Sequence, residues 1–433
     1  MSFRQKICDA LRLLAIGLIA GVVTMALDQS IHGVFQSIYG ALTALTLPQF
    51  ALGAGAALLA GSLIAGFLTH QVAPEARGSG VPQMKSAYLA KNPRISLRGL
   101  VTKFVACVIG IGSGLSLGRR GPSAFIGAAV GSNVAEATGA APQFRKTAFA
   151  AGSAAGLAAA FNTPLAAITF FLEEVLNEWN AQRITHLLLA TAPAILFFGW
   201  LHGPDPIFQL DLDSKLSLAT LLLLTPTALA ASALGCWLQG TILFLGRRFA
   251  RADGSYHWTT PMIGAMAVWA IGTLAYAATK DTAAFGLGDA PLNRLISGAV
   301  PVSLALVWIA ARFFGVAIAF GSGGCGGVFT PLLFLGGAVG FSVGATAEEW
   351  GIASRPDTQA LIAIGMCACI GAVVQAPLTA TLMMFEMTHS FALLPALMGA
   401  TLISQTVGRR LCGLSIYDAL LSNHSRSAPR KHG

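Results

Sequence analysis

Residues 112–131 read GSGLSLGRRGPSAFIGAAVG, and residues 321–340 read GSGGCGGVFTPLLFLGGAVG. The two stretches share ten identical positions when the first is moved from 112 to 321. Each is a glycine-rich loop followed by a proline and an apolar segment, which is typical of a loop that leads into a helix. A helix N-terminus carries about half a positive charge and can hold an anion. Paired, glycine-interrupted hydrophobic segments in two halves of a chain indicate the substrate site of a membrane transporter.

A second pair of segments also matches between the two halves. FNTPLAAITFFLEEV begins at Phe161 and VQAPLTATLMMFEMT begins at Val374, so that Pro164 aligns with Pro377. Two independent matches predict an internal duplication, although hydropathy does not decide whether the repeats run parallel or inverted. We therefore divide the chain into a first membrane repeat with a short N-terminus, a linker, a second membrane repeat, and a C-terminal helix with a basic tail: 1–202, 203–214, 215–407 and 408–433.

The composition excludes a soluble protein. Hydrophobic residues make up 55% of the chain and charged residues only 10%, whereas soluble domains carry about 25% charged residues. Apolar runs recur from near residue 13 to near residue 407, and about 20 apolar residues suffice for one membrane crossing. The sequence therefore predicts an all-α polytopic membrane protein.

The net charge of +9 lies outside the apolar runs. Arg4 and Lys6 precede the first hydrophobic segment, and Arg409 and Arg410 follow the last. This distribution does not indicate nucleic-acid binding, and the positive-inside rule places both termini in the cytoplasm. The seven cysteines lie mostly in apolar runs, so we expect packing residues and neither a metal site nor a disulfide framework.

Three glutamates follow strongly apolar residues. An ionised carboxylate at the centre of a bilayer costs at least about 2.5–3.5 kcal/mol. Glu173 and Glu386 are equivalent in the two repeats, and we predict that they bond backbone N–H groups at helix ends. Glu174 aligns with Met387 and has no acidic counterpart, which indicates a task confined to one half.

Together these motifs resemble the CLC family of chloride channels and chloride/proton antiporters, in its prokaryotic form without CBS domains. The chain reads GSGVP at 78–82, GRRGP at 118–122 and GVFTP at 327–331, with Tyr417 near its end. The resemblance implies two inverted repeats with broken and re-entrant helices, and a homodimer with one pore in each subunit. It also implies an integral protein of a bacterial inner membrane.

The resemblance implies a chloride site as well. By motif match, the hydroxyls of Ser79 and Tyr417 donate to a central anion, and the backbone N–H groups of Val328 and Phe329 coordinate it. The N–H groups around Arg120 and Gly121 serve an outer site. Such neutral donors hold a halide strongly enough to bind and weakly enough to release. Bound chloride is expected, and no other cofactor.

The chain departs from the family at position 120. Family antiporters carry a glutamate there that gates the anion path and relays protons, whereas this chain has Arg120. Arginine stays protonated and cannot relay protons. Glu174 matches the family's internal proton-transfer glutamate, and it is here either that residue or a structural carboxylate. The side chain of Arg120 either faces the pore or turns out to the extracellular solution.

We therefore predict passive chloride transport, by a channel or an uncoupled uniporter. The alternatives are a proton-coupled antiporter with a different proton path, and transport of fluoride or nitrate. Ser79 and Pro122 are the chloride-type residues of the family. An enzyme is not expected, because the eight histidines are scattered and form no H-E-x-x-H motif. The expected partners are chloride, the lipid bilayer and a second copy of the chain, and no nucleic acid.

Overall fold

The protein is α-helical throughout the part of the chain that its computed structural model describes. The described residues are 3–90, 92–176, 178–203, 205–212, 216–253 and 257–427. Within them no strand forms, and one isolated antiparallel bridge joins Gly118 to Gly327. In this described part of the chain, eight helices are long and apolar enough to cross a membrane.

The helices occur in two successive sets of eight. The first set is α1 (Phe3–Leu42), α2 (Leu47–Phe67), α3 (Val81–Leu89), α4 (Leu97–Gly112), α5 (Arg120–Ala137), α6 (Pro142–Phe161), α7 (Pro164–Phe170) and α8 (Ala181–His202). The second set is α9 (Leu218–Asp253), α10 (Thr260–Thr279), α11 (Asp289–Ser297), α12 (Val302–Gly321), α13 (Phe329–Glu349), α14 (Arg355–Val374), α15 (Pro377–Thr388) and α16 (Leu394–Leu411). Short helical segments interrupt the first set at η1 (Leu68–Val72), η2 (Pro74–Ala76) and η3 (Phe171–Leu176).

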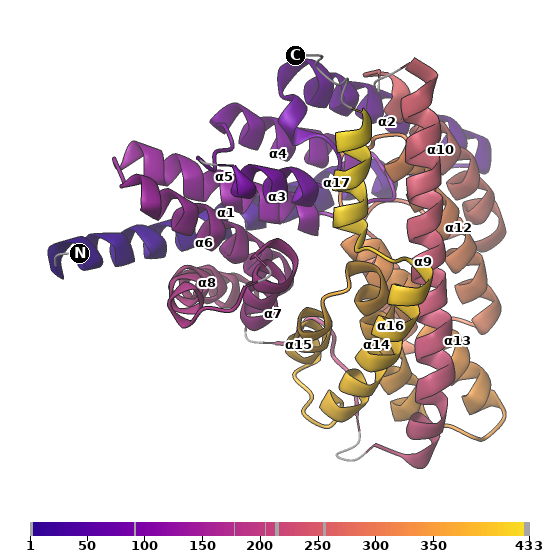
Figure 1. Ribbon diagram of the computed structural model, residues 1–433. Helices are drawn as coiled ribbons and strands as arrows, with labels where there is room; N and C mark the ends of the chain where they lie inside the picture. Colours follow the sequence, from indigo (N-terminus) through magenta and orange to yellow (C-terminus); the bar gives the residue numbers. More distant parts are fainter. Residues whose placement is uncertain are drawn as a thin grey trace.

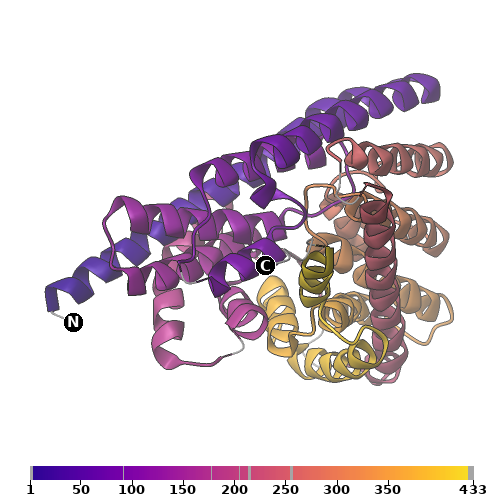
Figure 2. The same cartoon turned by 45° about the horizontal axis from the view of Figure 1, so that its top comes forward.

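A final helix, α17 (Ile416–Ser427), returns from the second set to lie against α3 of the first (Figure 1). The indigo-to-magenta helices and the orange-to-yellow helices lie largely side by side, with α1 extending along the edge in the second view (Figure 2). Residues 428–433 of the predicted tail, and 204 and 213–214 of the predicted linker, lie outside the described residues.

Glycines let the duplicated helices touch backbone to backbone. A side chain at Gly127 of α5 would collide with the carbonyl of Gly152 in α6. At the equivalent place in the second set, a side chain at Gly336 of α13 would collide with the carbonyl of Gly365 in α14. Small residues drive helix packing in membranes because lipid supplies no hydrophobic force between helices. The repeated small-residue pattern thus builds the same helix pair twice.

Two glutamates cap helices of the opposite repeat. The Glu386 carboxylate accepts hydrogen bonds of 2.9 and 2.8 Å from the N–H groups of Leu165 and Ala166, in the first turn of α7. The Glu173 carboxylate accepts bonds of 3.1 and 2.8 Å from the first turn of α15. A carboxylate at a helix N-terminus is stabilised by the helix dipole and by unpaired N–H groups. The prediction that both residues bond backbone N–H groups at helix ends is confirmed.

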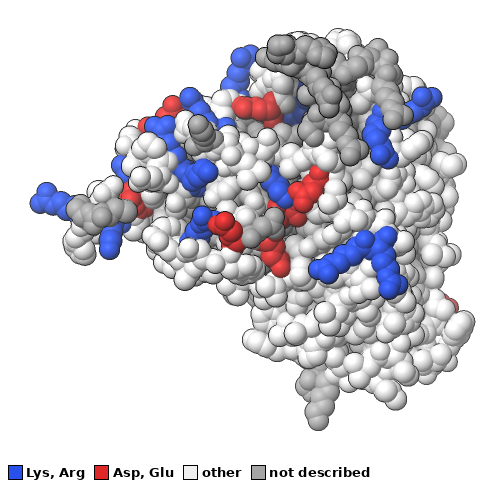
Figure 3. All heavy atoms as spheres, viewed as in Figure 1, with Lys and Arg blue, Asp and Glu red and all other residues white. Residues whose placement is uncertain are grey.

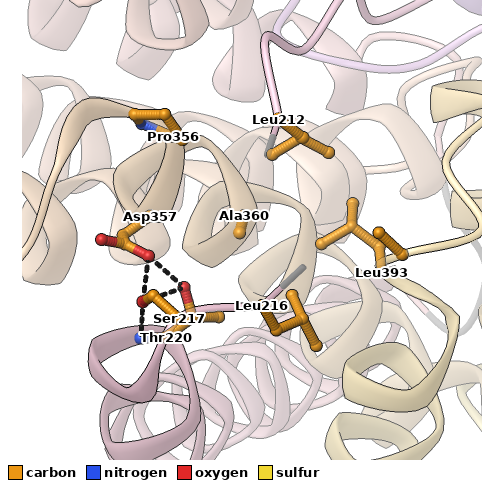
Figure 4. Close-up of a pocket in the computed structure, with 9 residues that line it drawn as sticks. Leu212, Leu216, Ser217, Thr220, Pro356, Asp357, Ala360 and Leu393 are labelled. Atoms are coloured by element: carbon orange, nitrogen blue, oxygen red, sulfur yellow. Dashed lines mark hydrogen bonds between the residues drawn. The ribbon is translucent and has the colours of Figure 1, made fainter. Parts of the chain in front are cut away.

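The chain between the two sets is fastened to α14. Asp357 accepts hydrogen bonds from the hydroxyls of Ser217 and Thr220, the latter at 2.6 Å (Figure 4). Beside them is a shallow pocket with mostly apolar walls, among them Leu212, Leu216, Ala360 and Leu393. None of the predicted anion ligands lines this pocket, so it belongs to the junction between the repeats.

Charged side chains are unevenly spread over the face in Figure 3. They gather in its upper part, and the lower part over α13 to α16 is almost uncharged (Figure 3). Large apolar residues such as Leu378, Phe391 and Leu402 are exposed on α15, on α16 and between them. An uncharged, apolar exterior suits contact with lipid. The predicted fold class, an all-α polytopic membrane protein with two inverted repeats and broken helices, is confirmed.

Candidate anion-binding site

Three glycine loops that are far apart in the sequence meet at one place. Gly118 and Gly327 exchange backbone hydrogen bonds, with N···O distances of 2.7 and 2.6 Å. The N–H group of Gly326 donates to the carbonyl of Gly78 at 3.2 Å. The GSGVP, GRRGP and GVFTP motifs, read separately from the sequence, therefore form one structural unit.

The backbones in this unit approach too closely for side chains at two positions. Gly80 precedes α3 with a φ of 92°, in the left-handed region that glycine tolerates best. A side chain at Gly121 would meet the carbonyl oxygen of Ser79 at 2.8 Å. The two glycines thus allow the GSGVP loop to lie directly against the start of α5.

The start of α13 presents free backbone donors to this unit. The N–H groups of Gly326 and Gly327 are used by the neighbouring loops, but Val328 and Phe329 stand at the N-terminus of α13. The first N–H groups of a helix have no carbonyl of their own helix to bond. Both residues are buried. An anion placed here would meet unpaired donors and the positive end of a helix dipole.

The two predicted hydroxyl ligands belong to segments that contact the loop before this helix or its first residue. Ser79 is buried beside Gly121, and its oxygen accepts a 3.3 Å hydrogen bond from the N–H of Val81, which leaves its own O–H free to donate. Tyr417 is buried in the first turn of α17, with its ring centre 6.4 Å from that of Phe329. The structure thus gathers Ser79, Tyr417 and Phe329 into one region.

Two consecutive arginines at the start of α5 differ in their partners. Arg119 is held by two carboxylates, through a 2.8 Å ion-pair contact between Nε and Asp28 and a 2.7 Å hydrogen bond from Nη1 to Asp289. These pairs neutralise Arg119 and tie α5 to α1 and α11. Arg119 is therefore a structural residue, and its two carboxylates are already engaged.

Arg120 is buried and forms no direct ion pair within the described residues, although the charges of Asp289 and Asp28 act on it. It is only 2% exposed, and within the described residues its Nε and Nη1 atoms have no hydrogen-bond partner. Its guanidinium carbon lies 3.9 Å from the centre of the Phe161 ring. The alternative that Arg120 turns out to the extracellular solution is therefore wrong. Burial of a charged group costs free energy when its donors lack partners, so the unbonded Nε and Nη1 groups make this position attractive to an anion.

Aromatic rings connect Arg120 with Tyr417. Phe161 makes an edge contact with Phe329 at 5.5 Å between ring centres, and Phe329 in turn faces Tyr417. Phe170 touches both Phe329 and Tyr417. Sequence reasoning did not assign Phe161 a role, although it opens the second duplicated segment. Its place at the end of α6 joins the outer arginine to the α13 site.

Two lysines that the sequence analysis did not single out bond to the GSGVP loop and to Glu174. Lys103 donates to the carbonyls of Ala76 and Gly78, at 3.1 and 2.5 Å, and so fixes the GSGVP loop. Lys85 lies one turn into α3, and its Nζ atom bonds Glu174 at 3.1 Å and Asp418 at 2.6 Å. A lysine inside an otherwise apolar segment was the available signal for each.

Glu174 is the centre of a polar cluster. Its side chain is 5% exposed, and the hydroxyl of Ser415 donates to it at 3.1 Å. The cluster of Lys85, Glu174, Ser415 and Asp418 therefore joins α3, η3 and the start of α17. No group of three His, Cys, Asp or Glu side chains suited to a metal ion occurs among the described residues.

This chain is similar in sequence to a protein family and to individual proteins of known name. A family model described as "Voltage gated chloride channel" matches residues 61–409. The H(+)/Cl(-) exchange transporter ClcA of Vibrio cholerae is 31% identical over 425 residues, which cover 94% of this chain and 88% of the relative. ClcA of Klebsiella pneumoniae strain 342 is 30% identical over 429 residues, covering 96% and 89%.

Solved structures share the fold. A slow cyanobacterial Cl-/H+ antiporter aligns with a TM-score of 0.85 at 23% identity, over 98% of this chain and 99% of that one. A CLC-type fluoride/proton antiporter aligns with a TM-score of 0.78 at 20% identity, over 97% and 99%. With its three converging glycine loops and a family match over most of its length, this chain belongs to the voltage gated chloride channel (CLC) family.

Proposed function

We propose that this protein carries chloride passively across the membrane, as a channel or an uncoupled uniporter. The observation that carries the proposal is Arg120, a buried cation with no hydrogen-bond partner at Nε or Nη1 among the described residues, at the position of the family's gating glutamate. A proton relay needs a group that binds and releases a proton, and a guanidinium does not do so in proteins. Protons therefore have no carrier at the outer end of the anion path.

The donors around the start of α13 suit a halide. The hydroxyls of Ser79 and Tyr417 and the N–H groups of Val328 and Phe329 are neutral, so they bind an anion without holding it permanently. Arg120 adds a full charge. Two unit charges 4 Å apart interact by about 4 kcal/mol at an effective dielectric constant of 20. Such an attraction draws anions to the outer site, formed with the N–H groups around Arg120 and Gly121, and slows their release.

The Lys85–Glu174 ion pair supports the same proposal. Glu174 stands where family antiporters have their internal proton-transfer glutamate, but here its carboxylate is bonded to an ammonium group. An ammonium beside a carboxylate favours the ionised form. Glu174 then acts as a structural carboxylate.

The second candidate function is proton-coupled chloride exchange. The relatives in Vibrio cholerae and Klebsiella pneumoniae are named H(+)/Cl(-) exchange transporters, and this chain retains Glu174. Coupling would require a proton path that bypasses Arg120. Fluoride transport is less well supported, because Ser79 and Pro122 match the chloride branch of the family. We also propose a homodimer in a bacterial inner membrane, with both termini in the cytoplasm.

Flux and pH recording in the same liposomes tests the proposal. Purified protein in chloride-loaded vesicles should release chloride when a potassium ionophore supplies the counter-current, without a stoichiometric proton movement in the opposite direction. Protein-free vesicles provide the background. If an imposed chloride gradient drives protons uphill, transport is coupled and the second candidate function is correct.

A further inference from the structure

The cluster around Lys85 joins three segments that are distant in the sequence. Lys85 belongs to α3, which follows the Ser79 loop, Glu174 belongs to η3, and Asp418 directly follows Tyr417 in α17. A single Nζ atom donates to Glu174 at 3.1 Å and to Asp418 at 2.6 Å. One lysine thus connects the helices that carry both hydroxyls of the proposed chloride site.

The two carboxylates of this cluster are not equivalent. The Asp418 side chain is 42% exposed, so water solvates its carboxylate. The side chains of Glu174 and Lys85 are only 5% and 8% exposed. The ionisable groups that face Glu174 are Lys85, Asp418 and the buried phenol of Tyr417. Lys85 is the cation among these described groups. The charge of Glu174 therefore depends on Lys85.

We propose that Lys85 is a positioning residue for anion transport, which favours the ionised form of Glu174 against the effect of burial and holds the Tyr417 helix against α3. Its ammonium opposes proton binding by Glu174. Arg120 likewise leaves the outer position without a group that binds and releases protons. This inference deepens the proposed function and rests on it only for the identity of the transported ion. Proton binding by Glu174 would then be a latent property that Lys85 suppresses.

Removing the ammonium should reveal that property. Both carboxylates contact the same nitrogen, so they lie within about 6 Å of each other, a range at which like charges disfavour double ionisation. Without Lys85, the buried Glu174 has a neighbouring carboxylate and no cation. A proton shared by the pair then replaces the lost positive charge.

The experiment counts protons bound by purified protein in detergent. Between pH of about 9 and about 7, Lys85→Gln should take up more protons than the unmodified protein, because Glu174 then binds its proton at a higher pH. The double variant Lys85→Gln/Glu174→Gln should lose that additional uptake. Lys85→Arg, which retains a cation, should behave as the unmodified protein does. Lys6→Gln makes the same chemical change at an exposed site near the N-terminus and serves as the matched control.

A second variant separates the electrostatic role from the mechanical one. Asp418→Asn leaves the bond between Lys85 and Glu174 in place, so it should take up no additional proton. It removes the bond that holds the first turn of α17, so chloride binding measured by calorimetry should weaken in this variant. Size-exclusion chromatography of each variant verifies that the folded protein is being titrated.

Two results would overturn the inference: Lys85→Gln that binds no more protons than the unmodified protein, or a double variant that keeps the additional proton. Should Lys85→Gln fail to fold, the comparison of Lys85→Met with Lys85→Met/Glu174→Gln decides the question in the same way. Uphill proton pumping by the unmodified protein would refute passive transport. The proton count per variant tests Lys85 by itself, so the two failures are distinguishable.

Discussion

The guanidinium carbon of Arg120 lies 3.9 Å from the centre of the Phe161 ring, and both residues are buried. Arg120 is the first residue of α5 and Phe161 is the last residue of α6. A cation–π contact of this kind contributes about 2 kcal/mol when desolvated. That contribution offsets only part of the cost of burying a charged side chain whose Nε and Nη1 atoms have no hydrogen-bond partner among the described residues. The remainder is available to an anion that binds beside Arg120.

Replacement of Arg120 by methionine should reduce the stabilisation of the folded protein by bound anions. In chloride-free buffer, Arg120→Met should unfold at a temperature no lower than the unmodified protein, because a buried charge with unbonded donors at Nε and Nη1 is lost. Chloride should stabilise the unmodified protein more than the variant, because ligand binding to the folded state raises its stability. Thermal unfolding with and without chloride measures both. Equal chloride stabilisation in the two proteins would remove Arg120 from the outer site.

Chloride flux through the same position should increase or remain intact. A fixed charge that holds an anion by about 4 kcal/mol slows its exit, so Arg120→Ala should transport at least as fast as the unmodified protein in liposomes. Loss of flux in a folded Arg120→Ala variant would instead indicate that Arg120 is required for anion entry.

Introduction of the family's glutamate should restore coupling only in part. Arg120→Glu supplies a titratable group at the outer position, but Glu174 remains paired with Lys85. The double variant Arg120→Glu/Lys85→Gln should therefore move more protons per chloride than Arg120→Glu alone, as recorded by a pH electrode during chloride efflux. Equal coupling in both variants would mean that Lys85 does not restrict Glu174.

The hydroxyl ligands are open to a direct binding test. Ser79→Ala and Tyr417→Ala each remove one neutral donor, and a hydrogen bond to a charged ligand contributes about 1.5–3 kcal/mol. Chloride affinity measured by isothermal titration calorimetry should fall in both variants. If both bind chloride as the unmodified protein does, the central site lies elsewhere.

The reciprocal caps should contribute similar stability in the two repeats. Glu173→Gln and Glu386→Gln each weaken charge-assisted bonds to a helix start, with an expected loss of roughly 1–3 kcal/mol. Denaturation in mixed micelles should show a similar loss of unfolding free energy for both variants. Glu136→Gln is the control, because Glu136 forms an exposed ion pair with Arg94 and exposed pairs contribute little. A large loss in only one cap variant would contradict their equivalence.

Assembly is testable by crosslinking in mild detergent. Large apolar side chains are exposed on several helices, and such surfaces associate within the bilayer through close packing. A short crosslinker should trap a dimer, and the same treatment after denaturation should not. A monodisperse monomer that still transports chloride would show that dimerisation is not required.

The sequence by itself determined the duplicated helical architecture. Glycine, proline and small residues act locally, so the spacing of Gly127 and Gly336 within their motifs was enough to predict two equivalent helix starts. The same equivalence identified Glu173 and Glu386 as capping residues before their partners were known. Helix length and apolar composition likewise follow from neighbouring residues alone.

Only the tertiary structure decided whether each charged residue is buried and which groups it contacts. Arg120 could have faced water or the protein interior, and its burial depends on Phe161, which lies on another helix. Lys85 and Glu174 are 89 positions apart, and no local pattern predicts that they pair. The free energy of a charge depends on which groups surround it in space. Sequence motifs therefore located the anion site, whereas the fold determined whether protons can enter it.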